Sequence, residues 1–147
     1  MNRRGIFSVA LAAIGAPFAV AKAAAAPPSE DVPKVAYHLC DLDKVNFVLG
    51  NIENHFAGMG GPDKVKIALV IHGPALKAFH AASGRLDVRQ RLARLTGSGL
   101  APHVCGNTLK VQNTTVSELL PGFTVAERGG VVLLAELQAK GFAYLKP

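Results

Sequence analysis

The segment 65–72, VKIALVIH, constrains the fold of this chain more than any other stretch of its sequence. Its apolar residues follow one another almost without interruption, whereas a strand with one face in water alternates apolar and polar residues. An apolar run of this length is typical of a strand in a parallel sheet that is covered on both faces. Gly73 and Pro74 end the run at once, and the proline is suited to the first turn of a helix.

Segments of strand and helix character alternate along the rest of the chain. Further strands are predicted at 34–39, 103–105, 123–126 and 142–145, and helices at 45–56, 75–82, 88–95, 115–120 and 130–140. In the fourth of these helices, Thr115 and Glu118 are spaced as a capping box. The alternation predicts a single-domain, three-layer α/β fold of the flavodoxin or Rossmann type, with a mostly parallel sheet between helices.

The first 26 residues have the pattern of an export signal. Arg3 and Arg4 precede a short apolar stretch, and cleavage after Ala23 or Ala26 fits the small-x-small rule. The arginine pair is similar to a twin-arginine signal, and a general secretory signal is the alternative. Both routes predict a periplasmic protein, and the apolar stretch is too short to favour stable membrane insertion. A flexible lead-in over 27–33 and one domain over 34–147 would follow.

Removal of the signal lowers the positive charge of the protein. Three of the 16 Lys and Arg residues lie in the signal, so 13 remain against 10 Asp and Glu, a net charge of about +3. No run of Lys and Arg exceeds two residues, and aromatic residues are few. We therefore predict no nucleic-acid partner, because neither a phosphate-binding stripe nor a base-stacking surface is evident.

Candidate site residues follow three of the predicted strands. These residues are Cys40 and Asp41; His72 and Gly73; and Cys105, Gly106, Asn107 and Thr108. Ligands of an open parallel sheet bind beyond the carboxyl ends of its strands. Both cysteines of the chain fall on this edge, so we predict the functional site there.

Cys105 is the candidate nucleophile. Gly106 lets the backbone approach a ligand closely, and Asn107 and Thr108 offer hydrogen-bond donors. Amide groups in a loop that runs toward a helix can stabilise a thiolate, which is the reactive form of cysteine. The alternative is an inert cysteine buried in a strand.

Cys40 has three interpretations. It could form a disulfide with Cys105 in an oxidising compartment, act as a resolving thiol, or fill the core. The distance between the two sulfur atoms decides among them.

A metal site is a further alternative, because the pattern H-x-C occurs at His38-Leu39-Cys40 and again at His103-Val104-Cys105. Residues two apart on a strand face the same way. If the two strands were neighbours, four soft ligands could converge on zinc or copper. The C-x-x-C spacing of common zinc sites is absent, so we expect neither a metal nor another cofactor.

Several segments resemble the DsrE/DsrF-like family in the same order along the chain. They are VIHGPAL at 70–76, HVCGNTLKVQN at 103–113, the first strand and helix over 34–56, and the C-terminal tail over 119–147. The resemblance implies a DsrE-like α/β fold assembled as a homotrimer or homohexamer. The better-known members relay sulfur as a persulfide on one cysteine, and Cys105 matches that position. His72 and Gly73 match the neighbouring loop, and Cys40 stands where relatives often carry Ser.

Together these observations predict an exported DsrE-like protein that carries sulfur on Cys105. Its activity would be sulfurtransferase-like, with protein donors or acceptors of sulfur as partners. The alternative is a non-enzymatic oligomeric binding protein or redox protein, in which Cys105 is buried or paired with Cys40.

Overall fold

The computed structural model describes residues 32–147, so the predicted export signal and most of the predicted lead-in lie outside the described residues. Five strands form one sheet in the order β4-β3-β2-β1-β5, and every pair of neighbours is parallel. The strands are β1 Lys34–Leu39, β2 Lys66–Ile71, β3 Ala101–Cys105, β4 Thr124–Ala126 and β5 Ala143–Leu145. Within the described part, no helix is long and apolar enough to cross a bilayer.

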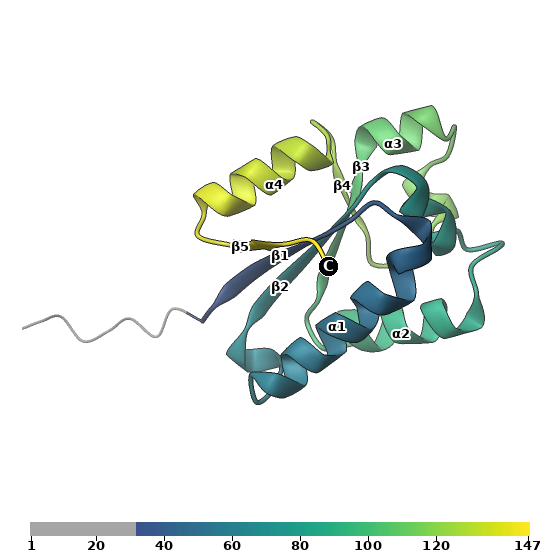
Figure 1. Ribbon diagram of the computed structural model, residues 1–147. Coiled ribbons are helices and arrows are strands. Elements are labelled where there is room, and N and C mark those ends of the chain that lie inside the picture. Colours follow the sequence, from purple (N-terminus) through teal and green to yellow (C-terminus); the bar gives the residue numbers. More distant parts are fainter. Residues whose placement is uncertain (1–31) are drawn as a thin grey trace, which may run out of the picture.

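Helices cover both faces of this sheet (Figure 1). They are α1 Val45–Gly58, α2 Leu86–Gly97, α3 Gly106–Val111 and α4 Gly130–Ala139, with short 3-10 helices η1 Leu42–Lys44, η2 Pro62–Lys64, η3 Gly73–Phe79 and η4 Val116–Glu118. The chain steps in one direction across the sheet from β1 to β4 and then returns to β5 at the far edge. Because crossovers between parallel strands are right-handed, the returning helix α4 lies on the face opposite α1 and α2. The predicted three-layer α/β fold is confirmed.

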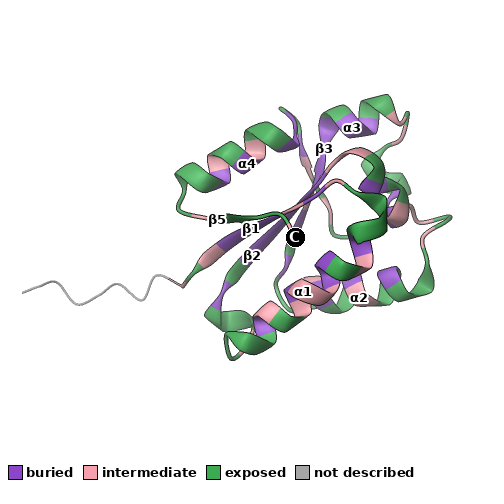
Figure 2. Ribbon diagram, in the orientation of Figure 1, coloured by how far each residue is buried: buried purple, intermediate pink, exposed green. Residues whose placement is uncertain are grey.

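Two cores of unequal size hold these layers together, and both are visible as buried stretches in Figure 2. The larger lies between the sheet and α1 and α2. The smaller lies beneath α4, where Ala36 and Ala68 let Leu134 and Leu137 approach the sheet closely. Strand β2 is buried on both faces from its second residue onward, as its unbroken apolar sequence predicts.

Two predicted helices are 3-10 helices. The segment predicted as a helix over 75–82 is η3, Gly73–Phe79. Its fully buried Leu76 and Phe79 are three residues apart, which matches the three-residue turn of a 3-10 helix. The segment predicted over 115–120 is η4, and the predicted capping box of Thr115 and Glu118 is present there.

One helix was predicted as a loop. The residues after Cys105 form α3, Gly106–Val111. Its Gly, Asn and Thr have low helix propensity, and only Leu109 among its apolar residues is buried. A helix this short and this polar shows no apolar period in the sequence.

The central place of β2 predicts a large cost for shortening its side chains. Leu69 is fully buried in β2, and replacing it with alanine leaves a cavity, so we expect Leu69→Ala to lower the free energy of unfolding by about 2–5 kcal/mol. The matched control is Leu86→Ala, since Leu86 is 68 % exposed, and we expect a change of about 0.5 kcal/mol or less. Urea unfolding followed by circular dichroism measures both; equal losses would contradict the assignment of β2 as the centre of the core.

Candidate functional site

A pocket of about 560 Å³ opens at the carboxyl edge of the sheet. It lies at the ends of β3 and β4, where the two helices that follow these strands diverge to opposite faces of the sheet. Leu109 of α3 packs into the core on the side of α1 and α2, whereas α4 covers the other face. Such a parting of connections opens a crevice at the edge of a parallel sheet. Five of the predicted site residues line the pocket: His72, Gly73, Cys105, Asn107 and Thr108.

Cys105 is the last residue of β3 and immediately precedes α3. Burial raises the pKa of its thiol, but four hydrogen bonds to sulfur outweigh burial and hold the pKa below its ordinary value. The donors are the backbone amides of Gly130, Thr108 and Asn107 and the hydroxyl of Thr108. They come from the first turns of α3 and α4, where backbone N–H groups have no partner within the helix. The arrangement favours a thiolate, the nucleophilic form of cysteine.

The turn that follows β2 orients one of these donors. The backbone N–H of Gly73 donates to Thr108 Oγ1 at 3.0 Å, so the hydroxyl of Thr108 keeps its own hydrogen available as a donor, and this hydroxyl lowers the pKa of Cys105. Gln112 donates from Nε2 to the carbonyl of Gly73 at 2.8 Å. Gly73 adopts a φ of 61°, a left-handed conformation that favours glycine. These bonds connect the turn firmly to α3.

Gly129 and Gly130 let α4 begin against Cys105, and they were not among the predicted site residues. A Cβ on Gly130 would lie 3.3 Å from the Cβ of Cys105 and 3.7 Å from that of His72. A Cβ on Gly129 would lie 2.9 Å from Nδ2 of Asn107. The sequence signal was a glycine pair between the fourth predicted strand and the next helix, at the same edge of the sheet as the other candidates.

Gly106 does not line this pocket, contrary to its predicted role. Its alpha carbon instead packs against the end of β4, where a Cβ would lie 3.1 Å from the carbonyl oxygen of Ala126. The close approach that glycine permits therefore serves backbone packing between α3 and β4.

Cys40 and Asp41 also lie outside the pocket. Cys40 belongs to a cluster of half-buried side chains, and Asp41 is its neighbour in the chain. Ligand atoms of His38, Cys40 and His72 lie within 4.8 Å of one another. His38 Nε2 is 2.5 Å from His72 Nε2, and His38 Nδ1 is 2.7 Å from the hydroxyl of Tyr144. His72 thus touches both this cluster and the Cys105 pocket.

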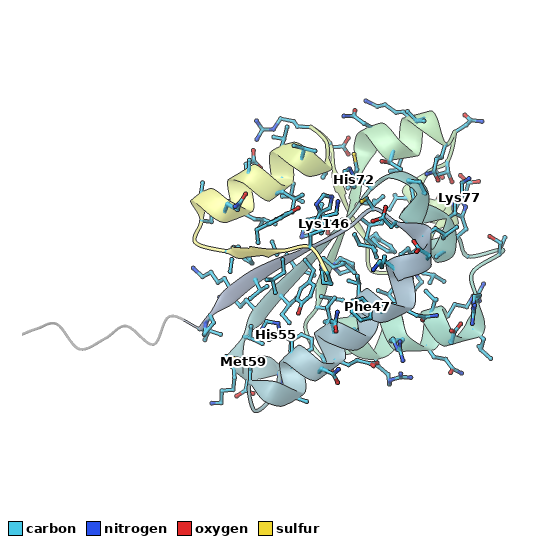
Figure 3. The ribbon with its side chains drawn as sticks, viewed as in Figure 1. Phe47, His55, Met59, His72, Lys77 and Lys146 are labelled. Carbon is cyan, nitrogen blue, oxygen red and sulfur yellow. The ribbon has the colours of Figure 1, made fainter. Side chains whose placement is uncertain are left out.

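Both imidazoles of the cluster have a lowered pKa, which favours their neutral forms. Burial, then His72 and Lys146, lower the pKa of His38 to about 4, against the opposing effect of Asp41. Burial and Lys146 also lower the pKa of His72, again against Asp41. Figure 3 shows His72 and Lys146 together at the edge of the sheet.

The two cysteines are both free, and β2 lies between their strands. Neighbouring strands are about 4.8 Å apart, so the ends of β1 and β3 are separated by roughly 9–10 Å. Two cysteines whose Cα atoms are more than about 7 Å apart cannot be bridged without backbone movement. His38 of β1 and His103 of β3 both pair in register with Val70 of β2, which lies between them. The two H-x-C pairs are therefore one strand apart, and the four-ligand site does not form.

Comparison with known proteins yields solved structures of the same fold. A protein of unknown function, MTH1491 from Methanobacterium thermoautotrophicum, matches with a TM-score of 0.69 and 26 % identity over 78 % of this chain and 99 % of its own. BT1422 from Bacteroides thetaiotaomicron, also of unknown function, gives 0.59 and 18 % over 78 % and 94 %. The ychN protein of E. coli gives 0.57 and 13 % over 78 % and 99 %. No protein-family model and no curated protein matches the chain.

The hydrogen bonds to Cys105 predict how its reactivity depends on pH. In a Cys40→Ser background, where only Cys105 reacts, we expect the alkylation rate to reach half its maximum at a lower pH than for a free cysteine, because the lowered pKa increases the thiolate fraction. Thr108→Val removes the hydroxyl donor and should move this midpoint to higher pH. Thr108→Ser keeps the hydroxyl and should leave it nearly unchanged.

The rate of iodoacetamide modification is measured by mass spectrometry between pH 5 and 10, at intervals of about one pH unit. The midpoint of each rate profile gives the pH at which half of the thiol is ionised. A midpoint at or above that of free cysteine in the Cys40→Ser protein would contradict the assignment of a stabilised thiolate.

Proposed function

We propose that this chain is a DsrE-like sulfur carrier, with Cys105 as the residue that accepts sulfane sulfur and holds it as a persulfide. One observation carries the proposal: Cys105 lies at the start of α3 and against Gly130 of α4, where backbone amides and the Thr108 hydroxyl lower the pKa of its thiol, and it lines a pocket large enough for a small donor. The resemblance of residues 34–147 to the DsrE/DsrF-like family and the shared fold of ychN support it.

The transfer step follows from thiolate chemistry. The Cys105 thiolate attacks the sulfane sulfur of a persulfide or polysulfide donor, and a new S–S bond forms while the old one breaks. The donor leaves as a thiolate or a shorter sulfide and takes the electron pair of the broken bond. No external oxidant or reductant is needed, because the transferred sulfur arrives already in the sulfane state.

The lining of the pocket suits such a donor. Lys77 and Arg128 both line the wall, but Arg128 also pairs with Glu136, so the net positive charge there is that of Lys77, which favours an anionic persulfide or polysulfide. The mouth carries exposed apolar side chains, with Val111 86 % and Val131 66 % exposed. An apolar mouth of this kind suits a protein donor or acceptor, or a second copy of this chain.

Export and assembly complete the proposal. The predicted signal would deliver a periplasmic protein, and the resemblance implies a homotrimer or homohexamer. The mass of the mature protein and light scattering after size-exclusion chromatography measure these two properties independently of the sulfur chemistry.

Intact-protein mass spectrometry tests the carrier function. After exposure to polysulfide we expect the mature protein to gain about 32 Da, one sulfur atom, and to lose it on reduction. Cys105→Ser should abolish the gain, whereas Cys40→Ser should retain it. Retained loading in Cys105→Ser would contradict the proposal.

The same spectra distinguish the alternative. A mass about 2 Da below the reduced form, unchanged by polysulfide, would indicate a disulfide between Cys40 and Cys105 and a structural or redox protein. An unmodified mass in every condition would favour a binding protein in which Cys105 is inert.

A further inference from the structure

We propose that His38, Cys40 and His72 form a binding site for one Zn²⁺ ion beside the Cys105 pocket, with Cys40 rather than Cys105 as its thiol ligand. Two imidazole nitrogens and one thiol sulfur of these residues lie within 4.8 Å of one another at the carboxyl edge of the sheet. Nitrogen and sulfur are the ligands that zinc prefers in proteins, and three protein ligands with one open position are typical of accessible zinc sites.

The backbone supports this set of side chains from two neighbouring strands. His38 lies in β1 and Cys40 directly follows the end of that strand, two residues further on, so their side chains leave the same face of the sheet where the extended backbone continues. His72 follows the end of β2, and its N–H donates to the carbonyl of Leu39 at 3.1 Å. The carbonyl of Cys40 accepts from the N–H of Ala75 at 3.0 Å. The three ligands therefore start from positions fixed by backbone hydrogen bonds.

The distances fit a single ion after a small side-chain movement. Zinc lies about 2.0–2.1 Å from histidine nitrogen and about 2.3 Å from cysteine sulfur, so ligand atoms around one ion are roughly 3.3–3.7 Å apart. The two Nε2 atoms, now 2.5 Å apart, would separate by about 1 Å, and the sulfur already lies within 4.8 Å of both imidazole ligand atoms.

A hydrogen bond on the far side of His38 defines which nitrogen faces the ion. The hydroxyl of Tyr144 lies 2.7 Å from His38 Nδ1, and with Nε2 bound to the metal the Nδ1–H would donate to the hydroxyl oxygen. Partners of this kind orient metal-binding histidines and increase their basicity.

The chain offers matched controls for each ligand. His103 pairs with Val70 on the side opposite His38, so it carries the same side chain at the same register without belonging to the cluster. Cys105 is the second thiol, and it lies beyond β2 from Cys40. Loss of binding on changing His38 or Cys40, but not His103 or Cys105, would be specific to this site.

The experiment is a titration of the mature, metal-free protein with Zn²⁺ against a chromogenic chelator. We expect one ion per chain, and a loss of affinity of more than about 100-fold in His38→Gln, His72→Gln and Cys40→Ser. Tyr144→Phe should weaken binding by about tenfold, as loss of an outer partner does. His103→Gln and Cys105→Ser should bind as tightly as the parent protein.

Substitution with Co²⁺ identifies the ligand directly. The protein and its Cys105→Ser variant should both show a sulfur-to-cobalt charge-transfer band, and Cys40→Ser should lack it. Urea unfolding of Cys40→Ser at a concentration similar to that of the parent protein would show that this variant is folded. Binding of less than one ion per chain, or a band lost in Cys105→Ser and kept in Cys40→Ser, would overturn the proposal. Because Cys105→Ser abolishes sulfur loading but not zinc binding, failure of one proposal leaves the other standing.

Discussion

Backbone amides from two helices converge on the sulfur of Cys105, and the arrangement of the rest of the site depends on this convergence. Each helix starts with N–H groups that its own hydrogen-bond ladder leaves free. The chain reaches α3 directly from β3, but it reaches α4 only after another strand and a glycine pair. Both starts meet at one point because β3 and β4 are neighbours whose following helices part.

Burial and hydrogen bonding act on Cys105 in opposite directions. Burial alone would keep the thiol protonated, as in most core cysteines. A hydrogen bond to a charged group contributes about 1.5–3 kcal/mol, so several donors together can outweigh the cost of desolvating a thiolate. At Cys105 the backbone amides and the Thr108 hydroxyl lower the pKa of the thiol despite its burial. A buried cysteine can therefore be the more reactive one, because its charge is stabilised by groups that the fold has already positioned.

Much of the fold could be predicted from the sequence, because parallel sheets leave strong local signals. The unbroken apolar run of β2 and the alternation of strands and helices indicated three layers, and the rule for carboxyl ends of strands indicated Cys105, His72 and Thr108. The order of strands could not be predicted, because pairing depends on contacts between distant segments. Without it, the distance between the two H-x-C pairs and the proximity of Cys40 to His72 were unknown. Gly130 was missed because its part is played by a backbone amide, which leaves no side-chain signal.

The two thiols offer the most direct test of the account. Cys105 is only 5 % exposed, whereas Cys40 is half-buried, so exposure alone predicts that Cys40 reacts first. Stabilisation of the thiolate predicts the opposite order. The measurement is brief alkylation of the metal-free protein at neutral pH, followed by quantification of the two labelled peptides. Preferential labelling of Cys105 is the result that the account predicts, and faster labelling of Cys40 would contradict it.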